Sequence, residues 1–135
     1  MRIKVYLLVL CIPFLLCCNR KTTHSVGEVT PKIVFNNLEY DFGTLSSRNE
    51  PVHYDFKFKN SGQSVLVIHS VESSCGCLDV QKPAKPIKPG KNASISLTFH
   101  PNATQYGYVK RYVDVYNNSS NLPLVHLTIC GVVEP

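Results

Sequence analysis

The amino-acid sequence predicts an all-β fold: an antiparallel sandwich of two facing sheets built from about seven short strands. From residue 32 onward, apolar side chains recur at every second position, the period of a strand with one buried face. Asn, Gly and Pro residues interrupt this alternation every eight to twelve positions or so, as turns do in sandwiches. No window after residue 31 carries the apolar stripe expected of a helix.

The first half of the domain supplies strands of different character. We expect extended segments at 32–36 and 38–42, then an alternating strand at 52–58 that ends in a turn at 60–62. Residues 65–68 are continuously apolar, which predicts a central strand covered on both faces. A short strand at 78–81 precedes a segment at 82–91 that cannot pair regularly, because its prolines lack the amide donor.

The second half is more regular. Residues 93–100 alternate, and the next strand carries valines on one face and tyrosines on the other: Tyr106, Tyr108, Tyr112 and Tyr116. After a loop at 117–121, the last strand directs Val125, Leu127 and Ile129 to the core, opposite His126, Thr128 and Cys130. Because each strand has one apolar side, two sheets must face each other. About a hundred residues of this kind form an immunoglobulin-like sandwich.

The N-terminus indicates export and lipid attachment. Arg2 and Lys4 precede an uncharged run that extends to Cys18. This run is shorter than the roughly 20 residues that cross a bilayer, and it is typical of a secretory signal. The sequence 15–18, Leu-Leu-Cys-Cys, resembles a bacterial lipobox. We therefore expect residues 1–17 to be a lipoprotein signal peptide and Cys18 to be lipidated, with diacylglycerol and palmitate-type chains holding it in the membrane.

The expected mature chain has two parts. Residues 18–31 lack apolar periodicity and are predicted to form a flexible tether, and residues 32–135 form the sandwich domain. An unlipidated signal peptide and an uncleaved anchor are the alternatives. The residues after Cys18 are not acidic, which favours a periplasm-facing position in the bacterial cell envelope.

Composition and motifs exclude several function classes. The formal net charge is +5, but it is spread without the dense basic blocks of a nucleic-acid binder. No nucleophile elbow, H-E-x-x-H helix or glycine-rich phosphate loop is present, so we expect neither catalysis nor a small-molecule substrate.

Three cysteines remain in the predicted mature domain: Cys75, Cys77 and Cys130. On a regular strand the Cβ atoms of Cys75 and Cys77 would lie about 6–7 Å apart, too far for a disulfide, whereas a tight turn at Gly76 would bring them together. Structural thiols or a disulfide are one possibility. Others are redox exchange, Cu(I) held by two thiolates, and zinc completed by Cys130 and one histidine. The histidine candidates are His53, His69, His100 and His126.

Two surface features are further candidates. Lys82, Lys85, Lys88 and Lys91 form either a basic loop that meets an anionic lipid or glycan, or a rigid solvated turn of ordinary composition. The tyrosines could stack on sugars or a partner protein, or simply pack across strands.

Several short motifs occur in the order seen in one family: Tyr40-Asp41-Phe42-Gly43, the segment 56–62, Ser74-Cys75-Gly76-Cys77, Ile87-Lys88-Pro89-Gly90, Phe99-His100-Pro101, Gly107, the segment 113–117, and Ile129-Cys130-Gly131. Over residues 33–133 the chain resembles the domain-of-unknown-function 1573 family of Bacteroidetes-type bacteria, which is related to Hydin-type immunoglobulin-like domains. The resemblance implies the sandwich fold but no reaction. Family members often have Thr where this chain has Leu78.

These observations predict a non-catalytic, lipid-anchored envelope protein without a resident cofactor. It would bind or scaffold another envelope protein through a sheet edge or its Tyr/Lys surface. The alternative is a thiol-redox or Cu(I)-binding envelope protein that uses the Cys75-Gly76-Cys77 element.

Overall fold

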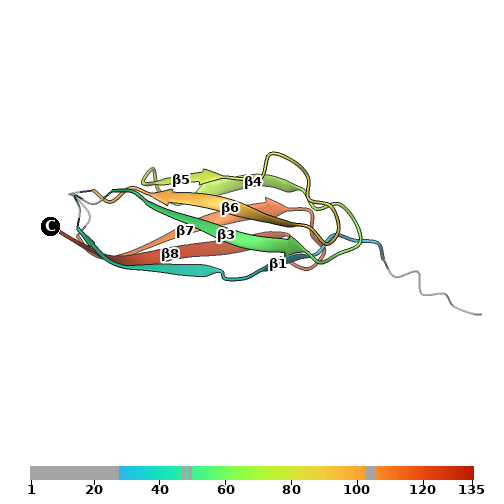
Figure 1. Ribbon diagram of the computed structural model, residues 1–135, viewed down its shortest axis with the longest axis horizontal. Coiled ribbons are helices and arrows are strands. Elements are labelled where there is room, and N and C mark those ends of the chain that lie inside the picture. The colour runs from blue at the N-terminus through green and yellow to red at the C-terminus, as the bar shows by residue number, and fades with distance from the viewer. Residues whose placement is uncertain (1–27, 47, 49, 103–105) are drawn as a thin grey trace, which may run out of the picture.

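The computed structural model describes residues 28–46, 48, 50–102 and 106–135, so the lipobox and Cys18 lie outside the described residues. The described chain forms two packed four-stranded sheets and contains no helix (Figure 1). Sheet A has the order β1-β3-β6-β5, and sheet B has the order β2-β8-β7-β4. The strands are β1 (Ile33–Phe35), β2 (Glu39–Ser46), β3 (Val52–Asn60), β4 (Ile68–Ser73), β5 (Leu78–Gln81), β6 (Asn92–Phe99), β7 (Gly107–Asn117) and β8 (Leu124–Glu134). The predicted sandwich is confirmed.

The strands pair antiparallel except at one place. β1 pairs with β3 in sheet A, and the chain then crosses to sheet B, where β2 lies parallel to β8. The prediction of a purely antiparallel sandwich is therefore wrong for this pair. The reason is that β1 and β2 continue in one direction while changing sheets, which brings the start of the domain beside its last strand.

The core lies between the sheets and follows the period-two pattern. The largest fully buried side chains are Phe56, Phe58, Phe99, Ile33, Leu66, Ile95, Leu97, Leu127, Ile129, Val113, Val115 and Val133. Burial of one such side chain stabilises the fold by roughly 1.5–3 kcal/mol. Two aromatic stacks cross from β2 to sheet A: Tyr40 lies 3.8 Å from Tyr54, and Phe42 lies 5.1 Å from Phe99, measured between ring centroids.

The Tyr40-Asp41-Phe42-Gly43 motif shapes the irregular part of β2. The Gly43 amide donates a 2.8 Å hydrogen bond to the Asp41 carboxylate, and Gly43 has a φ of 71°, which favours glycine. The β2–β8 register shifts between Asp41 and Thr44. The Phe42 ring lies against Gly131, where a Cβ atom would be 2.3 Å from the ring. Gly131 is thus needed for the approach of Phe42 to the core.

The apolar segment 65–68 departs from its prediction. It is not a central strand: Leu66 makes an isolated bridge to Ile87, Val65 is 42% exposed, and β4, which begins at Ile68, lies at the edge of sheet B. The segment is apolar because it carries the chain from sheet A to sheet B across the end of the core, where Leu66 and Ile68 are buried.

Asn60 joins three segments at the end of the sandwich where the described chain begins. Its side chain is fully buried and donates to the carbonyls of Ser64 and Ile87 at 2.8 and 2.9 Å. The same side chain accepts from the Gly62 amide at 3.0 Å. The Asn60 backbone bonds to Gly90 and Lys91 at 2.8 and 3.0 Å. One residue therefore fixes the turn at 60–64 against the loop at 82–91.

Thr30 and Pro31, which we assigned to the tether, contact the domain. The Thr30 carbonyl accepts from the Gln63 amide at 3.1 Å, and the Pro31 carbonyl accepts from the Ser120 amide at 2.9 Å. Asn121 both donates to and accepts from the backbone of Ile33. The ordered contacts thus begin before residue 32, because the loops at 61–63 and 118–121 enclose the entering chain.

The described residues contain no helical segment with the length and hydropathy of a membrane span.

Gly62 allows the closest backbone approach at this end. A Cβ atom there would lie 2.3 Å from the Thr30 carbonyl oxygen and 2.4 Å from the Lys32 nitrogen. We expect Gly62→Ala to lower the free energy of unfolding by about 3 kcal/mol, because backbone rather than a flexible side chain must move. Urea titration followed by circular dichroism measures this change. Gly76→Ala is the matched control, since nothing lies within 4 Å of its added Cβ; equal losses in the two variants would contradict the packing argument.

Candidate functional site

The outer face of sheet B carries the exposed tyrosines. Tyr108, Tyr112 and Tyr116 alternate along β7 with the buried Val109, Val113 and Val115, as predicted. Tyr108 is 67% exposed and Tyr112 is 47% exposed. Strand register places Glu39, Glu72, Lys110, Asp114 and His126 on the same face. We call these eight side chains the tyrosine face.

Hydrogen bonds connect the polar groups of the tyrosine face. Lys110 Nζ lies 3.4 Å from the Glu39 carboxylate, and this bond raises the pKa of the Lys110 ammonium above its usual value. The His126 ring lies 2.6 Å from the Asp114 carboxylate. Its three carboxylates, together with that of Asp41 beside them on β2, outnumber its one lysine, which leaves the face acidic on a chain whose formal net charge is +5.

Cys130 lies beneath the tyrosine face. It points away from the core, as predicted, but only 3% of it is exposed, because β8 lies between β2 and β7 and their side chains cover it. Its thiol lies 3.7 Å from the Glu39 carboxylate. Hydrogen bonding between Tyr108 and Cys130 raises the pKa of Tyr108 above the ordinary tyrosine value. The cysteine thus supports the face from below and does not meet the other two cysteines.

Cys75 and Cys77 form a disulfide at the turn between β4 and β5. Their Cα atoms are 5.2 Å apart, so the chain turns at Gly76 instead of continuing as a strand. Two hydrogen bonds fix the turn. The Ser73 hydroxyl donates to the Cys75 carbonyl at 3.1 Å, and the His100 amide donates to the Cys77 carbonyl at 3.0 Å. The bond closes the turn where the chain crosses from sheet B to sheet A.

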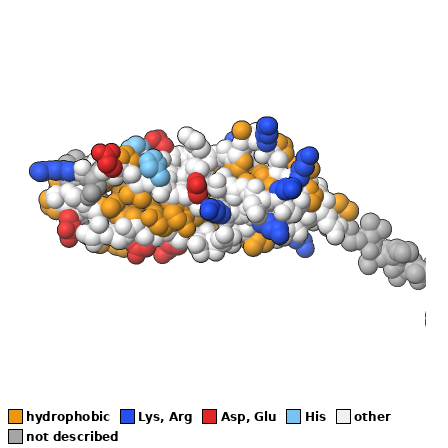
Figure 2. All heavy atoms as spheres, viewed as in Figure 1, with side chains coloured by type: hydrophobic (Ala, Val, Ile, Leu, Met, Phe, Trp, Pro, Cys, Tyr) orange, Lys and Arg blue, Asp and Glu red, His pale blue; other side chains and the backbone are white. Residues whose placement is uncertain are grey.

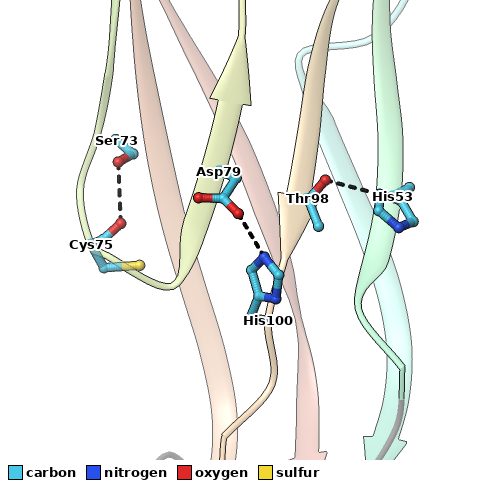
Figure 3. Close-up of polar contacts among 6 residues, drawn as sticks. All are labelled: His53, Ser73, Cys75, Asp79, Thr98 and His100. Atoms are coloured by element: carbon cyan, nitrogen blue, oxygen red, sulfur yellow. Dashed lines mark hydrogen bonds and ion pairs between the residues drawn. The ribbon is translucent and has the colours of Figure 1, made fainter.

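The candidate histidines do not gather around the cysteines. The His100 ring points to the Asp79 carboxylate at 2.8 Å, and His53 contacts the Thr98 hydroxyl at 2.9 Å (Figure 3). His69 lies on β4, and His126 lies on the tyrosine face. Within the described ranges, no group of three or more His, Cys, Asp or Glu side chains is placed to hold a metal ion. The zinc set that the sequence left open, Cys75, Cys77, Cys130 and one histidine, is therefore not assembled by the described residues.

The Asp79–His100 pair was missed by sequence analysis. It borders a shallow groove of about 400 Å³ along β6, lined on its outer side by His53, Asp55, Asp79, Gln81, Ser96 and Thr98. The Asp55 carboxylate accepts from the Ser96 hydroxyl at 2.6 Å, so cross-strand polar pairs occupy this surface. The pair could have been predicted only from the alignment of Asp79 with Thr98 on neighbouring strands. This alignment depends on the β5–β6 register, which the sequence does not specify.

The lysine loop lies at the end where the described chain begins. Lys85 and Lys88 are exposed there on either side of the buried Ile87. Lys82 donates from its Nζ atom to the Ile68 carbonyl at 3.1 Å. Figure 2 shows most of the Lys and Arg side chains of this view near the same end.

Comparison with solved structures shows the same fold at low sequence identity. A protein of unknown function from Porphyromonas gingivalis W83 matches with a TM-score of 0.69 and 17% identity, over 82% of this chain and 51% of that one. The chain therefore spans about half the length of that protein. The ASH/PapD-like domain 7 of human CEP192 matches with a TM-score of 0.62 and 13% identity, over 99% and 96% of the two chains. The YadV chaperone matches with a TM-score of 0.54 and 12% identity, over 77% and 53%.

No curated protein matches this sequence. The family comparison is specific, because residues 33–133 match the family described as protein of unknown function (DUF1573). These residues include every strand from β1 to β7 and nearly all of β8. The chain belongs to the DUF1573 family.

Proposed function

We propose that this protein is a non-catalytic binding module of the bacterial cell envelope, and that its tyrosine face recognises a partner protein. The carrying observation is the pair of exposed tyrosines on β7, Tyr108 and Tyr112, held on a rigid sheet. A tyrosine offers a large contact area with few rotatable bonds, and its hydroxyl can bond to the partner. Interface hot spots are accordingly rich in tyrosine.

The charge of the face indicates the chemistry of the partner. Glu39, Glu72 and Asp114 surround the tyrosines, and Lys110 is already bonded to Glu39. A partner surface that carries lysine or arginine beside apolar groups would complement this arrangement. The tyrosine rings would supply the buried centre of such an interface, and the carboxylates its charged rim.

The polar pairs of the described chain favour binding over catalysis. His100 and His126 each contact a carboxylate, and His53 contacts Thr98. In the described ranges, none of these histidines links a carboxylate to a nucleophilic hydroxyl or thiol, as a catalytic triad requires. Similarity to a PapD-like domain and a chaperone is compatible with a binding role.

Placement in the envelope rests on the N-terminal sequence. The charged start, the short apolar run and the cysteine that ends it support a lipoprotein signal peptide at 1–17 and a lipidated Cys18. Several acyl chains on one residue give stable membrane attachment, whereas one chain does not. A periplasm-facing position follows from the non-acidic residues after Cys18.

A second candidate function rests on the Cys75–Cys77 disulfide. The turn is partly exposed, so a dithiol reductant could reach it and convert the disulfide to two thiols with two electrons and two protons. Two adjacent thiolates suit Cu(I). A redox or copper-handling role would use this turn and not the tyrosine face.

The tyrosine face is tested by photo-crosslinking in cells. With benzoylphenylalanine in place of Tyr112, we expect one discrete adduct, and Tyr108→Ala should reduce its yield about thirtyfold, since a hot spot contributes roughly 2 kcal/mol. The same probe at Gln81, exposed on sheet A, should give no such adduct. Val34→Ala is the control for Tyr108→Ala and should leave the yield of the adduct unchanged. It truncates a side chain that is 50% exposed on β1 of sheet A. Equal adducts from both probes would exclude the tyrosine face as the recognition surface.

Lipid attachment is tested by metabolic labelling. Cells fed an alkyne fatty acid should label the wild-type protein, and Cys18→Ala should abolish the label, because Cys18 supplies both the sulfur and the new N-terminus. Cys17→Ala is the control and should remain labelled. Labelling that survives Cys18→Ala would refute this anchor.

The two functions are separated by the double variant Cys75→Ser/Cys77→Ser. A three-residue disulfide loop restrains the unfolded chain little, so we expect unfolding free energy to fall by roughly 1–2 kcal/mol while the crosslinked adduct persists. Urea titration, intact-mass thiol counting and copper analysis of the purified protein measure the outcome. A folded double variant that loses its cellular phenotype along with bound copper would instead support the second candidate.

A further inference from the structure

We propose that the lysine-rich end of the sandwich binds the anionic phospholipid headgroups of the membrane that carries the anchor. This inference rests on the proposed attachment at Cys18. It adds a second membrane contact, made by side chains of the folded domain, and it sets the orientation of the domain.

The entering chain and the lysine loop are fixed at one place. The Ser61 amide donates to the Lys32 carbonyl at 2.8 Å, and the neighbouring Asn60 bonds through its backbone to Gly90 and Lys91. The point where the chain reaches the domain is therefore tied to the loop at 82–91 through two consecutive residues, Asn60 and Ser61. The chain that comes from an anchor before residue 28 would therefore reach the domain at the end that carries this loop.

The charge at this end is strongly one-sided. Its lysines come from the entering chain, the end of β3 and the loop: Lys32, Lys59, Lys82, Lys85, Lys88 and Lys91. Among the described residues, Glu28 lies at the same end, beside Thr30 and Lys32. The C-terminus lies at the opposite end, together with Arg48, Glu50 and Glu134 (Figures 1 and 2).

The loop is rigid enough to present its lysines outward. Leu66 and Ile87 exchange backbone hydrogen bonds of 2.8 and 2.9 Å, and Ile87 is buried. Pro83, Pro86 and Pro89 restrict the backbone between the lysines. Lys85 and Lys88 therefore stay on the surface on both sides of a fixed point, and little loop entropy is lost when they meet a charged surface.

A membrane suits this end better than a soluble polyanion because the tether limits the distance. The twelve peptide steps from Cys18 to Thr30 extend at most about 43 Å. The tether would therefore keep the lysines close enough to meet the bilayer repeatedly. Attraction to the anionic surface then acts within a Debye length of about 8 Å. Basic residues next to a lipid anchor reinforce membrane binding in this way.

The resulting orientation leaves the tyrosine face accessible. The strands run between the lysine-rich end and the end that carries the C-terminus (Figure 1). With the lysine-rich end on the membrane, the tyrosine face stands beside the bilayer instead of on it, open to a partner in the adjacent space.

The test is vesicle co-sedimentation of residues 18–135 carrying Cys18→Ala, which keep both sheets and the whole described core without an acyl chain. We expect binding to vesicles of phosphatidylcholine that contain roughly 30% of the anionic lipid phosphatidylglycerol. We expect no binding to vesicles of phosphatidylcholine alone. K85Q/K88Q should lower the partition coefficient about 25-fold, since each lysine contributes about fivefold near an anionic surface. R48Q/R111Q removes the same formal charge away from the lysine-rich end and outside the tyrosine face, and it should change the partition coefficient less than twofold.

Other outcomes would overturn the proposal. An equal loss in both double variants would mean that net charge alone drives binding. Binding to soluble dextran sulfate without binding to anionic vesicles would assign the lysines to a glycan-like polyanion. Since this protein lacks an acyl chain and the assay contains no partner protein, its result is independent of Cys18 labelling and of the crosslinking at Tyr112. Unchanged far-ultraviolet circular dichroism confirms that each variant is folded.

Discussion

The buried amide of Asn60 is the interaction on which the end of this sandwich depends. A fully buried side-chain amide must satisfy its donors and its acceptor, and Asn60 does so with Ser64, Ile87 and Gly62. In doing so it locks the turn after β3 to the loop before β6. The entering chain fits only because Gly62 has no Cβ atom. Chain entry, turn and lysine loop thus form one unit, from which the proposed membrane contact follows.

The two ends and the two faces of the domain divide the charge unequally. The acidic tyrosine face lies along sheet B, and the lysines gather at the end where the described chain begins. A sandwich permits this division because outward side chains are free of packing constraints, so each face can acquire its own chemistry. The proposed roles of anchoring and partner recognition therefore use separate surfaces and need not compete.

The cysteines divide in the same way. Cys75 and Cys77 bond to each other at the crossing between sheets, whereas Cys130 lies on β8 under Tyr108 and Glu39, with β7 between it and that turn. The disulfide braces a turn, and the buried thiol packs like a small apolar side chain. This separation argues against the alternative of a zinc set and leaves Cys75 and Cys77 as the basis of the second candidate function.

The sequence by itself determined which face of the regular strands points into the core. Period-two patterning marks Phe56, Phe58 and Val113 as core and Tyr108 and Tyr112 as surface, because a strand exposes alternate residues whatever its neighbours are. Tertiary structure alone decided the parallel β2–β8 pair, the edge position of β4 and the burial of Cys130, since each depends on which strands become neighbours. The local sequence pattern carries no information about which strands become neighbours. The contact between the chain entry and the lysine loop also depends on residues that are distant in the chain, so the pattern could not predict it either.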